Sequence, residues 1–239
     1  MESHPMKADS IDYEILGEDF HAVVITLDPG EAVQAEPGAL MFMEEDIDMG
    51  TSTGGGLLSG LKRKLAGERF FVTSFENEGD VRRKVGFASE HPGNVKAVDL
   101  SEGTVYCQRD AFLCCARGVT VSVAFTKRLG AGFFGGEGFV LQKLQGDGLA
   151  FMHAGGHVIE RRLAPRERLR IDTGCLVGFD ETVDYSIKLV GGVTSKIFGG
   201  EGLFLASLEG PGRVWMQTMP FSRFADRVVE ATQRARGES

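Results

Sequence analysis

A chain of 239 residues can bury about 70–75% of the surface that its unfolded form would expose, so it needs neither disulfides nor metals to fold. Its formal net charge of −8 argues against non-specific binding to nucleic acid, which requires a basic surface. No apolar run approaches the roughly 20 residues that a membrane-spanning helix needs, and residues 1–10 contain no apolar signal core. We therefore expect a flexible leader over residues 1–10 and a soluble, cytoplasmic protein.

Short apolar runs separated by glycine turns continue along most of the chain, and they predict an all-β fold. The first strands are expected at residues 13–16 and 22–27, followed by a turn at Asp28-Pro29-Gly30. Proline sets φ to about −65° in such a turn, and glycine is free to adopt a positive φ. Further strands are expected over residues 81–87, 93–100, 111–125, 148–153 and 157–163.

The hydrophobic period changes from that of strands to that of a helix near the C-terminus. One helical face collects Phe221, Phe224, Ala225, Val228 and Val229. This pattern predicts an amphipathic helix over residues 221–236, with Ser222 available as the N-cap. We expect the helix to lie on the β body and cover an apolar face or a sheet edge, and a membrane-surface role is the alternative.

One glycine-rich pattern occurs three times, which indicates internal repeats. Residues 134–139 (FGGEGF) return 64 positions later as residues 198–203 (FGGEGL), and a weaker copy occupies residues 65–71 (LAGERFF). Similar turns open and close each segment. The pattern predicts a single β body over residues 11–220 made of three tandem β-sandwich-like repeats, at about 11–80, 81–148 and 149–220.

The common catalytic motifs do not survive inspection. Gly130 to Gly135 spell G-x-G-x-x-G, but the residues that follow favour a strand, whereas a dinucleotide site requires a helix there. Gly50 to Gly54 spell G-x-S-x-G, but three glycines make a poor start for the helix that a nucleophile elbow needs. The four cysteines form no C-x-x-C pair and are expected to be buried apolar residues. We expect no cofactor and no enzymatic activity.

Two further residue sets could bind a ligand. His153 and His157 flank Gly155-Gly156 and could meet across a hairpin, although acidic partners for a metal are scarce nearby. Glu68, Glu137 and Glu201 are equivalent acids in the three glycine loops. Each carboxylate is expected to fix its turn by accepting backbone N–H groups, and the alternative is a ring of acids that binds a cation.

A basic and apolar segment lies at each glycine loop, which is notable in an acidic protein. If the repeats are related by pseudo-threefold symmetry, these segments share one rim, here called the glycine-loop rim. Such a rim would suit an anionic lipid surface or a partner protein, whereas the alternative places its apolar side chains in the core. The rim comprises Leu57, Leu58, Leu61, Lys62, Arg63, Lys127, Arg128, Phe133, Phe134, Lys196 and Phe198.

The chain resembles bacterial members of the altered-inheritance-of-mitochondria family, described as mitochondrial-biogenesis-like. The resemblance rests on segments at residues 27–31, 36–40, 134–139, 158–160, 172–174, 199–203 and 210–215. It implies a shortened double-stranded β-helix in each repeat, like that of the tryptophan-RNA-binding attenuator protein, and a homotrimer that forms a ring of nine units. It implies no catalytic residue, and the RNA-binding habit of the fold is not transferred to this acidic chain.

Two classes of function follow from these observations. The first is a non-enzymatic ring or scaffold that binds a membrane surface or a membrane-associated partner through the glycine-loop rim. The second is a small-ligand or metal-binding protein that uses the three equivalent glutamates or the histidine pair. Closure into a ring would also cover the apolar edges that a chain of β units leaves open.

Overall fold

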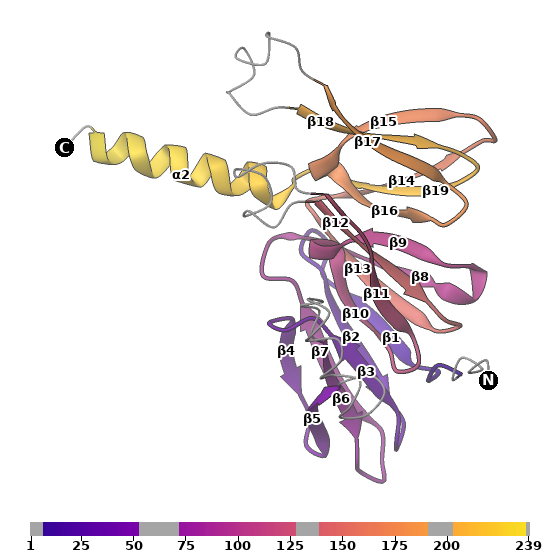
Figure 1. The fold of residues 1–239 in the computed structure, drawn as a ribbon. Helices are drawn as coiled ribbons and strands as arrows, with labels where there is room; N and C mark the ends of the chain where they lie inside the picture. Colours follow the sequence, from indigo (N-terminus) through magenta and orange to yellow (C-terminus); the bar gives the residue numbers. More distant parts are fainter. Residues whose placement is uncertain (1–6, 53–71, 128–138, 191–202, 238–239) are drawn as a thin grey trace.

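The computed structural model describes residues 7–52, 72–127, 139–190 and 203–237, and it is built almost entirely from antiparallel strands (Figure 1). In chain order the strands are β1 (Asp12–Leu16), β2 (Ala22–Leu27), β3 (Ala32–Ala35), β4 (Leu40–Met43), β5 (Ile47–Ser52), β6 (Val72–Asn77), β7 (Arg83–Ala88), β8 (Gly93–Asp99), β9 (Val105–Gln108), β10 (Phe112–Ala116), β11 (Thr120–Lys127), β12 (Phe139–Gln145), β13 (Leu149–Gly155), β14 (Val158–Leu163), β15 (Arg168–Asp172), β16 (Leu176–Asp180), β17 (Asp184–Val190), β18 (Leu203–Glu209) and β19 (Gly212–Gln217). Helix α2 (Phe221–Gly237) ends the described chain. The predicted all-β fold with a C-terminal helix is confirmed.

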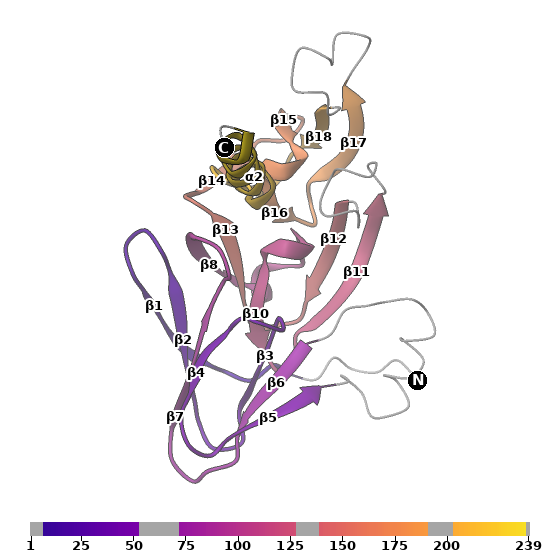
Figure 2. The same ribbon diagram turned by 90° about the vertical axis from the view of Figure 1, so that its left-hand side faces the viewer.

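The strands form four sheets that follow one another through the molecule (Figures 1 and 2). The first sheet has the order β1-β2-β7-β4, and the second has β5-β6-β3-β10-β13-β8. The third sheet has β11-β12-β9-β16-β19-β14, and the fourth has β15-β18-β17. Neighbours in a sheet are therefore often distant in the sequence, as in the pairing of β3 with β10.

The strand order repeats with a constant shift of six. Adding six to each strand number of the second sheet gives the third sheet in full. The same shift turns β4-β7-β2 of the first sheet into β10-β13-β8, and turns β11-β12-β9 into the fourth sheet, β17-β18-β15. The first and fourth sheets thus correspond to opposite halves of a six-stranded sheet. The strand order thus has a period of six strands, and the predicted division into three repeats stays a prediction.

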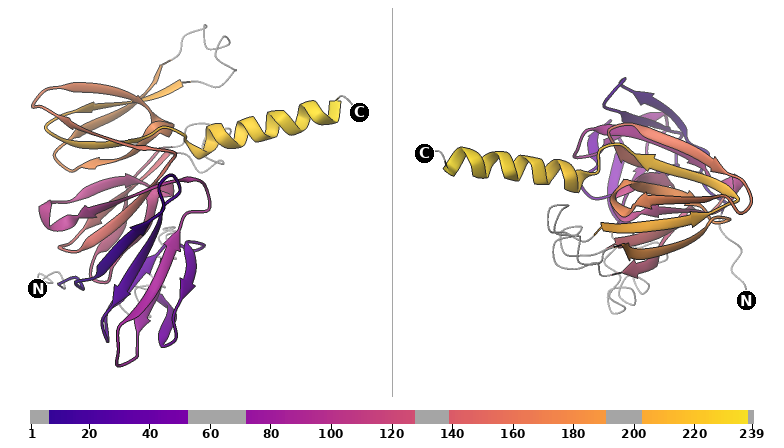
Figure 3. Two further views of the ribbon diagram at one scale, coloured as in Figure 1. Left: turned by 180° about the vertical axis from the view of Figure 1, so that it is seen from behind. Right: turned by 90° about the horizontal axis from the view of Figure 1, so that it is seen from above.

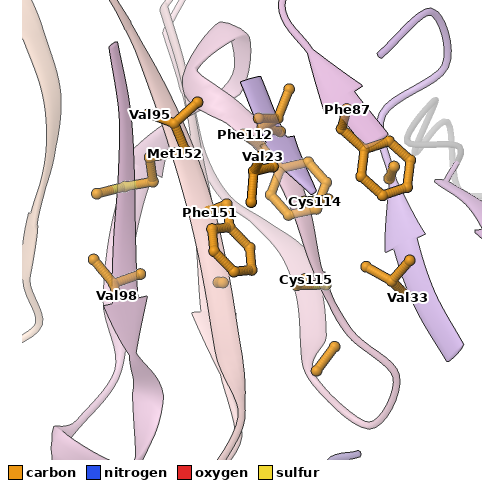
Figure 4. Packing of buried hydrophobic residues seen from close by; sticks show 14 of the residues in the cluster. Val23, Val33, Phe87, Val95, Val98, Phe112, Cys114, Cys115, Phe151 and Met152 are labelled. Carbon is orange, nitrogen blue, oxygen red and sulfur yellow. The ribbon is translucent and has the colours of Figure 1, made fainter. Parts of the chain in front are cut away.

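Two hydrophobic clusters fill the spaces between the sheets. The larger cluster joins the first, second and third sheets, and Figure 4 shows its centre around Phe112, Phe151 and Met152. The smaller cluster lies between the third and fourth sheets and contains Phe139, Phe179 and Leu208. Strands inside the second sheet, such as β10 and β13, are covered on both faces, so nearly all of their residues are buried.

The cysteines are core residues, as expected. Cys107, Cys114 and Cys115 are buried and Cys175 is half-buried, and all four are free thiols. Cys114 and Cys115 point to opposite faces of β10, and both faces are covered because this strand lies in the middle of the second sheet. Burial raises the pKa of the Cys115 thiol to about 12, so this thiol is chemically inert at neutral pH.

Helix α2 differs from its prediction in two respects. It does not lie on the β body but projects away from it, which is plain in both views of Figure 3. Its first turn is closed by a hydrogen bond from the Phe224 N–H to the Pro220 carbonyl, so Pro220 takes the cap position in place of the expected Ser222. The amphipathic pattern therefore marks a helical face that the rest of the described chain does not cover.

The histidine pair also differs from its prediction. β13 and β14 belong to different sheets, so the chain between His153 and His157 crosses from one sheet to the next and forms no hairpin. His153 is buried and packs edge-on against His91, with ring centroids 4.5 Å apart. The expected meeting of His153 and His157 across a hairpin was wrong.

Candidate interaction surfaces

The most unusual surface of the molecule is the apolar strand β4. Its four residues, Leu40 to Met43, are all between 37% and 51% exposed, and among the described strands β4 pairs only with β7. The equivalent strand β10 is paired on both sides, and its five residues are all buried. An unpaired apolar edge is a template for pairing with another chain.

The register identifies which residues of these strands are equivalent. The pairing of β4 with β7 shifts between Leu40 and Phe42, and that of β10 with β13 shifts between Phe112 and Cys114. The pairing of β16 with β19 has the same irregularity just before Gly178. Phe42, Cys114 and Gly178 are therefore equivalent positions, each next to a β-bulge.

Strand β15 is a second strand that lacks a neighbour on one side among the described residues, although its equivalent strands have neighbours on both sides. β3 and β9 each have two partners in a six-stranded sheet, whereas β15 pairs only with β18 within the described residues. Arg168 and Arg170 lie exposed on this strand, and Arg168 donates to the Glu209 carboxylate at 2.7 Å. We call β4 and β15 the two open edges.

Ion pairs span the two internal junctions, which are the pairing of β3 with β10 and the pairing of β9 with β16. Arg117, the residue after β10, contacts Glu76 at 2.9 Å and Asp9 at 3.0 Å. Glu181, the residue after β16, accepts a hydrogen bond from Lys143 at 2.9 Å. By the register, the equivalent residue is Glu45, the second residue after β4, and it is exposed. Each junction therefore has a charged residue at the same position.

Helix α2 carries a second apolar surface. Phe221, Phe224, Val228 and Val229 are between 41% and 55% exposed and lie along one face. The base of the helix is attached to the body by Arg223, which contacts the Asp172 carboxylate at 2.7 Å, and by the ring of Phe221 beside that of His91. Residues 221–237 contain four arginines and two acidic residues, so the helix is basic in an acidic chain.

A cluster of histidines lies where β8 begins. The Val95 N–H donates to Nδ1 of His21, which leaves Nε2 as the donor to the Glu18 carbonyl and fixes a neutral tautomer. The pKa of His153 falls to about 4 because burial disfavours its charged form, and His91 and His21 add to that effect. Within the described residues no three His, Cys, Asp or Glu side chains are grouped to hold a metal ion.

Glu36, just after β3, is a partly buried acid. Its pKa rises from 4.5 to about 7 because burial disfavours the carboxylate, and the nearby Asp110 adds repulsion. The native state therefore holds this proton more tightly than the unfolded state between about pH 4.5 and 7. Its contribution to stability is present below pH 4.5 and is lost as the pH rises through 7.

Glu36→Gln should remove that loss. We expect the free energy of unfolding at pH 8 to increase by about 1–3 kcal/mol relative to the parent, with little change at pH 4.5, because the neutral amide has no buried charge to accommodate. Urea unfolding at both pH values measures the difference. Glu14→Gln, at an exposed position on β1, is the control and should leave both values unchanged. An equal effect of Glu36→Gln at the two pH values would contradict the assignment.

The sequence-derived site residues lie mostly outside the described residues. This holds for Glu68, Glu137 and Glu201 and for the glycine-loop rim, of which only Lys127 falls in a described strand. The rim and the acid ring therefore stay predictions. The open edges were missed, because the run Leu40-Met41-Phe42-Met43 looks the same in the sequence whether it is buried or exposed. No local signal in the sequence separates the two cases, because the difference lies in the order in which distant strands pair.

No helix in the described part of the chain is both long enough and apolar enough to span a membrane.

Comparison with known proteins gives consistent results. A family model described as "Mitochondrial biogenesis AIM24" matches residues 13–219. An uncharacterized protein of Streptococcus pyogenes serotype M6 is 26% identical over 214 residues, which cover 86% of this chain and 84% of the relative. The crystal structure of a Streptococcus pyogenes protein, solved in a structural genomics programme, has a TM-score of 0.76 at 23% identity. It covers 92% of this chain and 99% of that one. At 23% identity, the similarity to this crystal structure concerns the fold alone.

Proposed function

We propose that this chain, which belongs to the mitochondrial biogenesis AIM24 family, is a non-enzymatic scaffold. In this proposal it forms a ring-like homotrimer that docks on an anionic membrane surface. The observation that carries the docking proposal is helix α2, whose apolar face is exposed and whose base is attached to the β body. The trimer is supported by the two open edges, since closing a ring covers both.

The composition of α2 suits the interface of a lipid bilayer. A helix with one apolar face and a basic polar face lies in the interface plane, with the apolar side chains among the acyl chains. Arg223, Arg227 and Arg234 follow one side of the polar face, and Asp226 and Glu230 lie beside them. Each basic residue near an anionic surface adds about 1 kcal/mol of attraction. Three helices on one ring would act together, because the second and third bind as tethered ligands.

Flotation with liposomes tests this function. The wild-type protein should float with vesicles that contain phosphatidylglycerol and much less with phosphatidylcholine alone. Val228→Asp should reduce the bound fraction about tenfold or more, because a charge enters the apolar face. Gln233→Asp adds the same charge on the polar face and is the matched control, which should bind nearly as well as the wild type. Wild-type protein that fails to float with anionic vesicles would contradict membrane docking.

The same assay tests the glycine-loop rim as a second docking surface. Leu58→Asp/Leu61→Asp should lower binding if the rim contacts lipid, after light scattering has shown that the variant stays assembled. The alternative function, metal binding by Glu68, Glu137 and Glu201, is tested by metal analysis of the purified protein. Bound metal at a fixed ratio to the chain would favour that alternative.

A further inference from the structure

We propose that the open edge β15 of one chain pairs antiparallel with the open edge β4 of a second copy, in the register used by the two junctions inside the chain. This inference rests on the assembly in the proposed function and names the two surfaces that form it. It would continue the fourth sheet of one chain into the first sheet of the next. The pair would form a seven-stranded sheet in which β17-β18-β15-β4-β7-β2 repeats the order of the two six-stranded sheets and β1 is added at the edge.

The topology supports a second copy of this chain as the partner. In each six-stranded sheet, three strands lie on one side of the internal junction and three on the other. The fourth sheet, β17-β18-β15, corresponds to the first three strands, and β4-β7-β2 corresponds to the last three. The chain thus ends on one half-sheet and begins on its complement. A self-pairing of β4 with β4 would leave β15 open in both copies, whereas β15 with β4 covers both edges. Such head-to-tail pairing forms a closed ring when the rotation closes.

The internal junctions give the register of the proposed pair. Ala35 lies opposite Cys114, and Cys107 lies opposite Gly178. A shift of 64 residues relates Cys114 to Gly178, and the same shift relates Cys107 to Ile171. Cys107 pairs with Gln142 on β12 and Ile171 pairs with Ala206 on β18, and these two partners also differ by 64 residues.

Since Phe42 is equivalent to Cys114, Phe42 of one copy should lie opposite Ile171 of the next. Met43 then lies opposite Arg170, and Glu44 opposite Leu169.

Equivalent hydrogen bonds at the C-terminal ends of β4 and β16 support this alignment. The Lys84 N–H donates to the Glu44 carboxylate at 2.8 Å, and the Arg213 N–H donates to the Asp180 carboxylate at 2.7 Å. Glu44 and Asp180 are equivalent in the register, so the two strands are fixed to their neighbours in the same way. β4 is thereby held in the conformation that β16 has in its junction.

The charges are complementary in this register. Glu45 of one copy lies opposite Arg168 and diagonal to Arg170 of the next, within reach of both side chains. The same position in the third sheet has Glu181, which accepts a hydrogen bond from the Tyr106 hydroxyl at 3.4 Å, and Tyr106 is equivalent to Arg170. In the proposed pair, Arg170 thus takes the place that Tyr106 has near Glu181 in the third sheet. The exposed side chains of β4 would at the same time become covered, as those of β10 are.

Disulfide trapping tests the register. In the internal junctions the Arg117 N–H donates to the Ala32 carbonyl, and the Glu181 N–H donates to the Thr104 carbonyl. Counting from these bonds, Glu44 and Leu169 form a non-hydrogen-bonded pair, whose Cα atoms lie about 4.5 Å apart in antiparallel sheets. That separation permits a disulfide. Glu44→Cys/Leu169→Cys, in a Cys175→Ser background, should give covalent oligomers on oxidation.

The control for trapping is Glu45→Cys/Leu169→Cys, whose side chains lie on opposite faces and should cross-link at least about tenfold less. Equal cross-linking by the two variants would overturn the register. If light scattering shows the protein to be oligomeric but no cross-links form, the edge pairing is overturned, whereas the proposal of an assembly stands. Monomeric wild-type protein at micromolar concentration would overturn both proposals.

A charge swap tests the same surfaces without cysteine chemistry. Glu45→Arg should raise the dissociation constant about tenfold, since it places a cation against Arg168 and Arg170. Arg170→Glu should weaken assembly in the same direction, and the double variant Glu45→Arg/Arg170→Glu should recover most of the loss. Glu14→Arg on β1 is the matched control and should assemble as the wild type does. Additive losses in the double variant would overturn the pairing of these residues.

Discussion

Trp215→Ala should lower the free energy of unfolding by about 3–5 kcal/mol, the largest stability effect that we expect from a single substitution in this chain. Trp215 is fully buried on β19 and belongs to the cluster that joins the second and third sheets. Its Nε1–H donates to the Glu160 carboxylate at 2.9 Å, and the Arg213 guanidinium lies 5.1 Å from the ring. Alanine would leave a cavity between two sheets and remove the donor that helps to hold Glu160.

Urea unfolding followed by circular dichroism measures this effect, and the protein concentration must be held constant because assembly also shifts apparent stability. Trp215→Phe is the control. It keeps most of the buried volume, loses the hydrogen bond, and should cost about 1–3 kcal/mol. A Trp215→Ala variant within about 1 kcal/mol of the wild type would show that this residue does not hold the two sheets together.

Arg170→Pro should have the largest effect on assembly. In the proposed register the backbone N–H of Arg170 points out of β15 toward β4 of the next copy, as alternate residues of β3 and β9 point toward β10 and β16. Proline removes that donor and is tolerated at sheet edges, where no intrachain bond is lost. We expect the dissociation constant to rise about a hundredfold, while the far-ultraviolet spectrum stays that of the wild type.

Arg170→Thr separates the backbone from the side chain. Threonine keeps the N–H and favours strands, so this variant should lose only the ion pair with Glu45 and assemble more weakly than the wild type by about tenfold or less. Analytical ultracentrifugation over a concentration series measures both variants. A proline variant that assembles as tightly as the threonine variant would contradict a backbone pairing at β15.

The sequence predicted individual strands well where turn residues bound a short apolar run. Residues 22–27 were expected as a strand and form β2 with the same bounds, and residues 157–163 form β14 apart from the first residue. Both runs are bounded by glycine or proline turns, and the first is rich in β-branched residues, which are local signals of a strand. The cysteines were likewise identified as core residues from their type alone.

The partners of the strands could not be predicted in the same way. β3 pairs with β10 at a distance of about eighty residues, and no local pattern in Ala32–Ala35 specifies that neighbour. The amphipathic period of α2 specified a face but not whether anything covers it. His153 was judged by its sequence spacing to His157, whereas the fold brings it to His91 through a different strand. Each of these outcomes depends on tertiary contacts that periodicity does not encode.

In the proposed assembly, the first and fourth sheets are complementary halves of a six-stranded sheet and are joined between neighbouring copies. This arrangement explains why an acidic protein keeps the apolar strand β4 on its surface and why arginines occupy β15. It also places α2 beside the proposed junction, because Arg223 at the base of the helix contacts Asp172 at the end of β15. Assembly and docking would then involve adjoining parts of the molecule.

The mass of the wild-type protein in solution tests this central claim most directly. Multi-angle light scattering at micromolar concentration should return three times the mass of the 25.9 kDa chain, and the peak should dissociate toward one chain for Arg170→Pro. A wild-type mass of one chain, unchanged at higher protein concentration, would contradict the ring and the pairing of its edges.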